Sequence, residues 1–196
     1  MRHTTTKRFT KRLSTGETIG VGELDTVTGQ SVSVPAPAGR THLQFRRFAG
    51  CPICSLHLHR FADRHQQLTD AGITEVVFFH SPAGELRGYQ ALLPFAVIAD
   101  PNRVYYRQFG VEKGLRALIS PRSWSAGARG YRAALRHRGD PNYAGVKSSS
   151  DGETHLGLPA DFLIEPDGTI VAVHYGRHAD DQWSIDELLD LHHALG

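Results

Sequence analysis

The chain has 196 residues, of which 40% are hydrophobic and 21% charged, a composition typical of one folded globular domain. A formal net charge of +2 gives no reason to expect nucleic acid as a partner. No apolar run is long enough to span a bilayer, and the basic N-terminus lacks the apolar segment of a secretory signal. We therefore expect no membrane association and a cytoplasmic location.

The first part of the chain predicts a tail, a hairpin and a strand. Residues 1–17 form a basic tail that we expect to be flexible, and residues 18–196 form the single domain. Alternating apolar and polar residues from Glu23 to Val34 predict a β-hairpin around Thr28-Gly29. Residues 41–48 then predict a strand that ends directly before the first cysteine.

Helices and buried strands alternate in the next part. Pro52 suits the first position of a helix, because its missing N–H costs nothing there, and Ala71-Gly72 ends this helix. Residues 73–79 and 95–99 are short apolar runs, as expected of strands covered on both faces. A short helix lies between them, and residues 100–110 predict another, capped by Asp100 or Asn102.

The last part predicts an irregular insertion and a second hairpin. Residues 111–157 are expected to form a helical and loop insertion, with a helix near residues 125–137. Residues 161–174 predict a hairpin around Pro166-Asp167-Gly168, and a final helix covers residues 185–195. This order of strands and helices predicts an α/β fold with three layers, α/β/α, around a central mixed sheet.

The only two cysteines, Cys51 and Cys54, form a CxxC motif where a strand meets a helix. A structural disulfide would not persist in a reducing cytosol, so reactivity or metal binding explains the pair better. Cys51 lies at the helix N-terminus, where the helix dipole favours a thiolate, and Cys54 lies one turn inside. We expect Cys51 to be the more acidic and accessible nucleophile, and Cys54 to be a sheltered resolving thiol.

A metal-binding or copper-handling module is an alternative interpretation, because Cys51, Cys54, His57 and His59 lie within nine residues. His57 and His59 point about 200° apart on one helix, so both cannot join the cysteines, and Cys51, Cys54 and His57 are the candidate ligands. No other cofactor is expected. A scaffold with incidental cysteines is a third interpretation. Four further histidines are candidates to modulate the thiols: His80, His155, His174 and His178.

The CxxC motif, with Leu158-Pro159 just before residues 161–165, resembles the thioredoxin superfamily over roughly residues 18–195. The N-terminal hairpin and residues 100–110 and 162–171 look like its peroxiredoxin-like branch, alkyl hydroperoxide reductase and thiol-specific antioxidant (AhpC/TSA). The resemblance implies a thioredoxin-like sandwich. It also implies that Pro159 is a cis-proline that faces the thiols.

Two features depart from the peroxiredoxin pattern. Peroxiredoxins carry Thr or Ser three residues before the peroxidatic cysteine. If Cys54 is taken as that cysteine, Cys51 occupies this position, and if Cys51 is taken, Phe48 occupies it. They also bring an arginine to the peroxide at the start of the hairpin strand, where this chain has Pro159. A peroxidase needs such donors to stabilise the leaving oxygen.

Our first hypothesis is therefore an enzyme, a thiol–disulfide oxidoreductase in which Cys51 attacks the substrate and Cys54 resolves the mixed disulfide. Its partners would be a protein or small-molecule disulfide and a thiol reductant. The alternative is a peroxiredoxin-like thiol peroxidase with an antioxidant role, in which peroxide oxidises Cys51 to sulfenic acid and Cys54 resolves it. The sequence leaves the natural substrate, the reductant, the reduction potential and the oligomeric state open.

Overall fold

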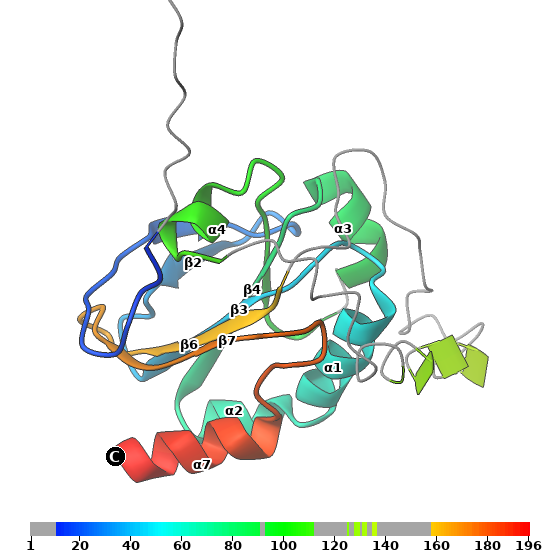
Figure 1. Ribbon diagram of the computed structural model, residues 1–196. Helices are drawn as coiled ribbons and strands as arrows, with labels where there is room; N and C mark the ends of the chain where they lie inside the picture. Colours follow the sequence, from blue (N-terminus) through cyan, green and yellow to red (C-terminus); the bar gives the residue numbers. More distant parts are fainter. Residues whose placement is uncertain are drawn as a thin grey trace, which may run out of the picture.

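The computed structural model describes residues 11–90, 93–111 and 158–196, together with residues 125, 128, 129, 131, 132, 135 and 136. Within these residues the chain forms a five-stranded sheet, a two-stranded hairpin and helices on both sides of the sheet (Figure 1). None of the helices in this part of the chain is long and apolar enough to cross a membrane. The insertion expected at residues 111–157 lies almost entirely outside the described residues.

The central sheet is mixed and has the order β5-β4-β3-β6-β7. The central strand β3 runs parallel to β4 and antiparallel to β6, while β4 pairs in parallel with β5 and β6 pairs antiparallel with β7. The predicted three-layer α/β arrangement around a mixed sheet is confirmed. The strands are β3 (Arg40–Phe45), β4 (Ile73–Phe79), β5 (Ala96–Ala99), β6 (Ala160–Ile164) and β7 (Ile170–Tyr175).

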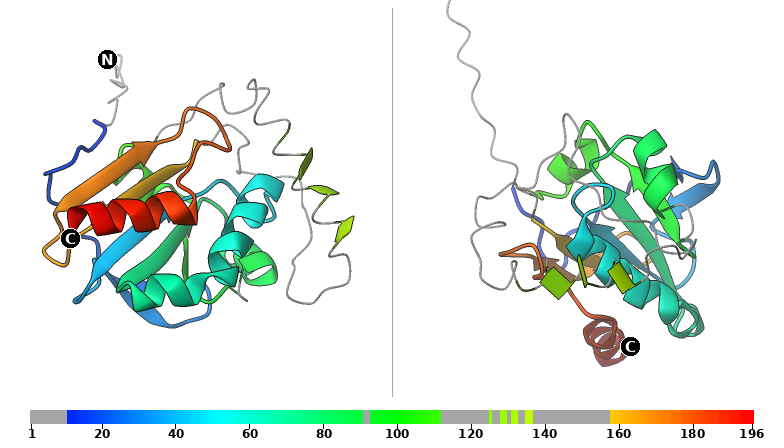
Figure 2. Two further views of the ribbon diagram at one scale, coloured as in Figure 1. Left: turned by 90° about the horizontal axis from the view of Figure 1, so that it is seen from below. Right: turned by 90° about the vertical axis from the view of Figure 1, so that its right-hand side faces the viewer.

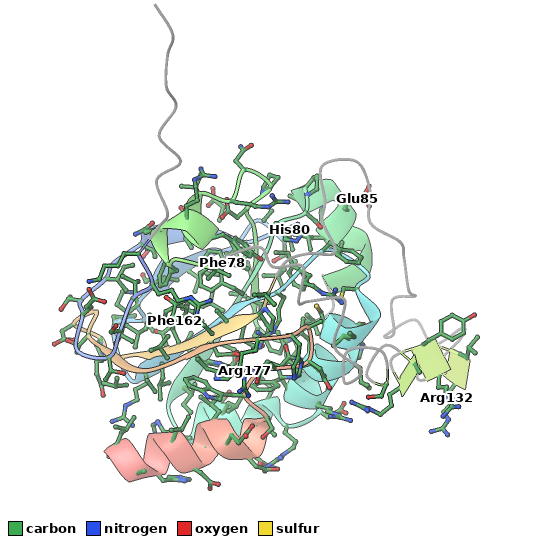
Figure 3. The ribbon with its side chains drawn as sticks, in the orientation of Figure 1. Phe78, His80, Glu85, Arg132, Phe162 and Arg177 are labelled. Atoms are coloured by element: carbon green, nitrogen blue, oxygen red, sulfur yellow. The ribbon has the colours of Figure 1, made fainter. Side chains whose placement is uncertain are left out.

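One face of the sheet is packed with aromatic side chains. Residues alternate between the two faces along each strand, so Phe45, Phe78 and Phe162 all point to this face. The Phe45 and Phe78 rings stack with centroids 4.9 Å apart, and Phe45 meets Phe162 edge to face at 5.8 Å. Figure 3 shows Phe78 and Phe162 on the side of the sheet that faces α4. This face is covered by the predicted hairpin, β1 (Gly22–Asp25) and β2 (Ser31–Val34), and by α4 (Val104–Gln108).

The Asp100 carboxylate bonds the free N–H groups at the start of α4, as the sequence predicts, although Arg103 occupies the N-cap position itself. This carboxylate accepts hydrogen bonds from the backbone N–H groups of Val104 and Tyr105, each at 2.8 Å. The short helix α3 (Ala83–Gln90) connects β4 to β5.

Three helices cover the opposite face of the sheet (Figure 2). They are α1 (Pro52–Asp63), α2 (His65–Asp70) and α7 (Ile185–Leu195). The start of α1 at Pro52 is as predicted, but a turn at Arg64 divides the predicted single helix into α1 and α2. A capping box of Ser184 and Glu187 begins α7.

The described part of the predicted tail, residues 11–17, contacts the domain. The Leu13 backbone N–H donates to the Tyr175 hydroxyl at 2.8 Å, and that hydroxyl donates to the Phe109 carbonyl at 2.6 Å. The Gly16 N–H donates to the Ile170 carbonyl at 2.8 Å. These bonds attach the segment along β7.

Candidate active site at the CxxC motif

The two cysteines lie where β3 gives way to α1. Arg46 extends β3, since its N–H donates to the Phe78 carbonyl at 2.8 Å, and the chain then turns through Gly50, which has a φ of 70°. A positive φ favours glycine, and the turn leaves Cys51 as the N-cap residue of α1. The predicted position of Cys51 at the helix N-terminus is confirmed.

The two sulfur atoms lie close together and are buried. Cys51 Sγ and Cys54 Sγ are 2.9 Å apart, against about 2.05 Å in a disulfide. Both cysteines are free thiols, with exposed fractions of 0% for Cys51 and 2% for Cys54. The two sulfurs are close enough for a disulfide to form after a local rearrangement, and both are buried in this conformation.

A buried guanidinium faces both sulfurs. Nη2 of Arg47 donates to Cys51 Sγ at 3.0 Å, and the same side chain also forms a hydrogen bond with Cys54. Arg47 is only 5% exposed, and burial works against its charge. The two sulfurs outweigh this cost and raise the pKa of Arg47, so its cation is stabilised by the cysteine pair.

The pair holds a single negative charge at neutral pH. Burial by itself raises the pKa of Cys54, but the hydrogen bond with Cys51, the charge of Arg47 and the Arg47 backbone N–H lower it to about 6. Burial, the hydrogen bond with Cys54 and its thiolate raise the pKa of Cys51 well above its ordinary value. These contacts favour the thiolate on Cys54, which is the reverse of the predicted order of acidity, and both thiols are buried. The roles of Cys51 and Cys54 as nucleophile and resolving thiol stay predictions. At the helix N-terminus the Cys54 N–H donates to Cys51 Sγ at 3.5 Å and lowers the pKa of Cys51, but burial and the Cys54 thiolate outweigh this hydrogen bond. One buried cation can support one thiolate.

A row of buried ionic side chains lies directly beside this site. Nη2 of Arg46 donates to Asp161 Oδ1 at 2.6 Å, and His42 Nε2 is 3.3 Å from the same oxygen. His42 Nδ1 is 2.6 Å from Glu75 Oε1. All four side chains are buried, and the two cations balance the two carboxylates. Each charge in the row therefore has a partner within the row.

The charges of this row follow from their mutual contacts. Burial lowers the pKa of His42, but Glu75 and Asp161 outweigh it and raise the pKa to about 9. Burial raises the pKa of Asp161, but the charge of Arg46 and the hydrogen bond from His42 hold it well below the usual range. His42 is therefore a cation and Asp161 an anion at neutral pH. The charge of Arg46 also lowers the pKa of Cys54.

His57 contacts this row and not the sulfurs. Its Nε2 lies 3.1 Å from Nη2 of Arg46, and its ring lies 4.7 Å from the Phe61 ring. Burial and the charge of Arg46 lower the pKa of His57 well below its ordinary value, so it is neutral and accepts this hydrogen bond. No group of three or more His, Cys, Asp or Glu side chains within the described part of the chain is arranged to hold a metal ion. His59 turns away, with Nδ1 2.7 Å from the Ser55 carbonyl.

Pro159 lies next to the site but does not have the predicted cis geometry. In the described residues the only cis peptide bond is Val34–Pro35, so the bond between Leu158 and Pro159 is trans. The trans form is the default for a residue before proline unless packing imposes cis. Here the Pro159 carbonyl accepts from the Gly176 N–H at 2.8 Å and continues the β6–β7 pairing. The register that pairs Phe45 with Ala160 brings Pro159 to the end of the sheet where β3 leads to the thiols.

Of the four histidines that were candidates to modulate the thiols, His80 contacts a residue of the site, Arg47. It is buried at the end of β4, and its backbone N–H donates to the Arg47 carbonyl at 3.2 Å. Figure 3 shows His80 at the end of the sheet nearest α3. His174 contacts Asp181 at 3.1 Å, and His178 accepts from the Asp180 N–H at 3.3 Å. His155 lies outside the described residues.

Arg47 and the ionic row were not predicted from the sequence. Arg46 and Arg47 stand directly before the CxxC turn, and His42, Gln44 and Arg46 alternate along one face of β3. Glu75 and Asp161 interrupt otherwise apolar strands. The row could have been recognised from polar residues in buried strands, which stand at alternate positions in β3 and singly in β4 and β6.

A family model matches a large part of the sequence. The model of the AhpC/TSA antioxidant enzyme matches residues 58–178, which is more than half of the chain. The chain belongs to the AhpC/TSA family. The matched segment begins after Cys54, so the cysteine pair and Arg47 are described by the structure and not by this match. No curated protein matches the chain at a significant level.

Solved structures agree with the AhpC/TSA assignment at the level of the fold. The peroxidoxin BcpB of Mycobacterium tuberculosis superposes with a TM-score of 0.65 at 17% identity, over 94% of this chain and 99% of that chain. A cysteine-to-serine mutant of PrxQ from Xylella fastidiosa gives 0.61 at 12% identity, over 94% and 96%. A cysteine-to-serine mutant of peroxiredoxin 6 from Arenicola marina gives 0.62 at 14% identity, over 93% and 73%. The thioredoxin-like fold predicted from the sequence is therefore confirmed.

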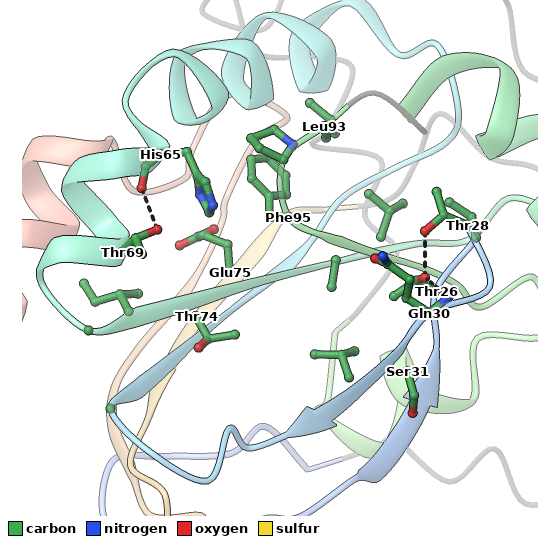
Figure 4. Close-up of a pocket in the computed structure, with 18 of the residues that line it drawn as sticks. Thr26, Thr28, Gln30, Ser31, His65, Thr69, Thr74, Glu75, Leu93 and Phe95 are labelled. Atoms are coloured by element: carbon green, nitrogen blue, oxygen red, sulfur yellow. Dashed lines mark hydrogen bonds between the residues drawn. The ribbon is translucent and has the colours of Figure 1, made fainter.

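A separate cavity of about 800 Å³ lies between the hairpin, α2 and the start of β4 in this AhpC/TSA protein (Figure 4). Hairpin residues 26–28 and 30–32, His65 and Thr69 of α2, and the first residues of β4 and β5 line it. Glu75 and His65 lie on one wall, and no cysteine lines it. The cavity is therefore separate from the cysteine pair.

Proposed function

We propose that this chain is a thiol peroxidase of the AhpC/TSA family, with Cys54 as the nucleophile and Cys51 as the resolving thiol. The observation that carries the proposal is the Arg47-stabilised thiolate. A lowered pKa of about 6 keeps Cys54 ionised at neutral pH, and the thiolate is the reactive form. Cys54 then has Cys51 at the position where peroxiredoxins carry Thr or Ser. Arg47 supplies the guanidinium that Pro159 cannot provide.

The reaction follows from these positions. The Cys54 thiolate attacks one peroxide oxygen, the S–O bond forms as the O–O bond breaks, and hydroxide or alkoxide leaves, with a sulfenic acid on Cys54. Arg47 is placed to stabilise the negative charge that moves onto the leaving oxygen. Cys51, 2.9 Å from Cys54, then attacks the sulfenic sulfur, forms the disulfide and releases water. Two equivalents of a thiol reductant restore the pair.

Stopped-flow oxidation by hydrogen peroxide tests this proposal. The unaltered protein should react faster than a small free thiol, and Cys54→Ser should lose the fast reaction. Cys51→Ser should keep one fast turnover and stop at the sulfenic acid, which dimedone labelling and mass spectrometry detect. A rate no faster than that of a small thiol would overturn the peroxidase. Fast oxidation retained in Cys54→Ser and lost in Cys51→Ser would return the nucleophile role to Cys51.

The first hypothesis from the sequence, thiol–disulfide exchange, is the second candidate function. The 2.9 Å separation of the two sulfurs supports it, because a CxxC pair this close can resolve a mixed disulfide. The burial of both sulfurs favours a small disulfide over a folded protein as substrate. Reduction of a small aromatic disulfide, with slow peroxide oxidation in the same preparation, would favour this function.

A further inference from the structure

The cavity between the hairpin, α2 and β4 has the size and lining of a small-molecule site. Its volume of about 800 Å³ lies within the range of about 300–1,000 Å³ that is usual for such sites. Such sites combine apolar walls with a few polar groups that fix the orientation of the ligand. The apolar side chains that line this cavity are Val27, Ile73, Leu93, Phe95 and Val97. They can pack against the apolar body of a ligand.

Glu75 places a carboxylate on the wall of this cavity. Its Oε1 lies 2.6 Å from His42 Nδ1 and its Oε2 accepts from Gln44, which uses two of the roughly four lone-pair positions of a carboxylate. Glu75 lines the cavity and His42 does not, so the negative end of this pair lies nearer to it. No Lys or Arg is among the described residues of the lining. The electrostatic potential in the cavity therefore favours a cation over an anion.

A second polar atom on the same wall has no partner. Nδ1 of His65 is buried and forms no hydrogen bond within the described part of the chain. The His65 ring lies beside Phe95, with the ring centroids 5.8 Å apart. In the tautomer with its proton on Nε2, Nδ1 is an acceptor, and a buried acceptor without a donor is costly. Figure 4 shows His65 and Glu75 on one wall, so a single group with several N–H donors can satisfy both.

We propose that this cavity binds a small organic ammonium ion, with its charged group between Glu75 and His65 and its apolar body against Phe95 and Val97. An ammonium group has three N–H donors and no acceptor, so it can donate to Glu75 and to His65 Nδ1 at once. A carboxylate or phosphate ligand would be repelled by Glu75, and the hydroxyl of an alcohol can donate to only one of the two acceptors. The inference goes beyond the proposed peroxidase function and does not depend on it, because no cysteine lines the cavity.

Three probes of similar size test the selectivity for charge: 2-phenylethylammonium, 2-phenylethanol and 3-phenylpropionate. Titrations followed by amide chemical shifts in NMR give the dissociation constants and locate the site. The ammonium should bind at least about tenfold more tightly than the alcohol, and the carboxylate more weakly than either. The shifts should gather at the amides of Thr28, Glu75 and Val97. An ammonium that binds no more tightly than the alcohol, or shifts that gather elsewhere, would overturn the inference.

A variant of His65 tests the second acceptor. His65→Phe removes Nδ1 but keeps a ring beside Phe95, so the ammonium should bind about tenfold more weakly. The matched control is His193→Phe, at an exposed position on α7 that does not line the cavity, and it should change the affinity less than about twofold. Unchanged affinity in His65→Phe would remove His65 from the site and contradict the proposed binding mode.

A pair of variants tests the Glu75 carboxylate. His42→Gln removes the cation that shares this carboxylate, so the ammonium should bind more tightly, by about threefold or more. His42→Gln combined with Glu75→Gln removes both charges of the pair together, and this protein should bind the ammonium and the alcohol equally. A preference for the ammonium that persists in the double variant would overturn the role of Glu75. Thermal melts check that each variant is folded, and the probe series and His65→Phe decide the inference even if the double variant does not fold.

Discussion

The two faces of the central sheet bury very different side chains. Toward α4 and the hairpin, β3, β4 and β6 present Phe45, Phe78 and Phe162, whose rings contact one another directly or through Phe45. Toward α1 and α7, the same three strands present His42, Glu75 and Asp161. Both sets of residues are buried.

The aromatic face needs only shape and apolar area, because its rings carry no charge. The ionic face depends on each charge keeping its partner, since burial of an uncompensated charge costs several kcal/mol. The thiols lie at the end of the ionic face, where Arg46 joins the row and Arg47 faces the sulfurs. The difference indicates that the aromatic face stabilises the fold by apolar packing, whereas the ionic face depends on paired charges, of which that of Arg46 also lowers the pKa of Cys54.

Removal of one charge should expose this difference most strongly. Asp161→Asn keeps the volume of the side chain but leaves Arg46 and His42 with one carboxylate fewer. We expect the free energy of unfolding to fall by about 4 kcal/mol, measured by urea denaturation. The matched change on the other face, Phe162→Leu, should cost only about 1 kcal/mol, because it replaces one apolar group by another of similar size. Equal costs for the two variants would contradict the assigned roles of the faces.

The ionic face should also give the protein a stability that depends on pH. Because the folded pKa of His42 is raised to about 9, its contribution is fully present below the unfolded value of about 6.5 and is lost as pH rises through 9. Cys54 has the opposite sign, since its depressed pKa adds stability as pH rises above 6. In the variant with Cys51→Ser and Cys54→Ser, unfolding free energy should therefore fall by about 3 kcal/mol between pH 6.5 and 9.5.

The control for this slope is His42→Gln in the same cysteine-free background. That protein should be less stable but nearly independent of pH over the same range, because the group that titrates is gone. Urea denaturation at five or six pH values measures both slopes. A slope that persists in His42→Gln would show that another group is responsible.

The sequence predicted the fold well because the fold depends on local signals. The alternation of apolar and polar residues predicted the N-terminal hairpin, Pro52 predicted the start of α1, and Asp100 predicted the hydrogen bonds at the start of α4. The position of Cys51 at the helix N-terminus followed from the same signals. These features depend on a few neighbouring residues, which a single sequence displays.

The chemistry of the site was predicted less well because it depends on contacts between distant residues. Arg47 and the close approach of the two sulfurs lower the pKa of Cys54, whereas the helix dipole alone favoured a thiolate on Cys51. Asp161 lies 115 residues from Arg46 in the sequence, so no local pattern pairs them. The cis geometry expected for Pro159 came from a family resemblance, and the local pairing with Gly176 did not require it.

A smaller effect should come from the Tyr175 hydroxyl, which connects the aromatic face to the N-terminal segment. The Tyr175 hydroxyl accepts from the Leu13 N–H at 2.8 Å and donates to the Phe109 carbonyl at 2.6 Å, while its ring lies edge to face with Phe162 at 5.5 Å. Tyr175→Phe keeps the ring contact and removes both hydrogen bonds. We expect a loss of about 1 kcal/mol in unfolding free energy and faster hydrogen exchange at the Leu13 amide. Tyr131→Phe, where the ring is 56% exposed, should change neither quantity. If exchange at Leu13 stayed slow in Tyr175→Phe, the segment would be held by its other bonds to β7, and the hydroxyl would contribute nothing to its attachment.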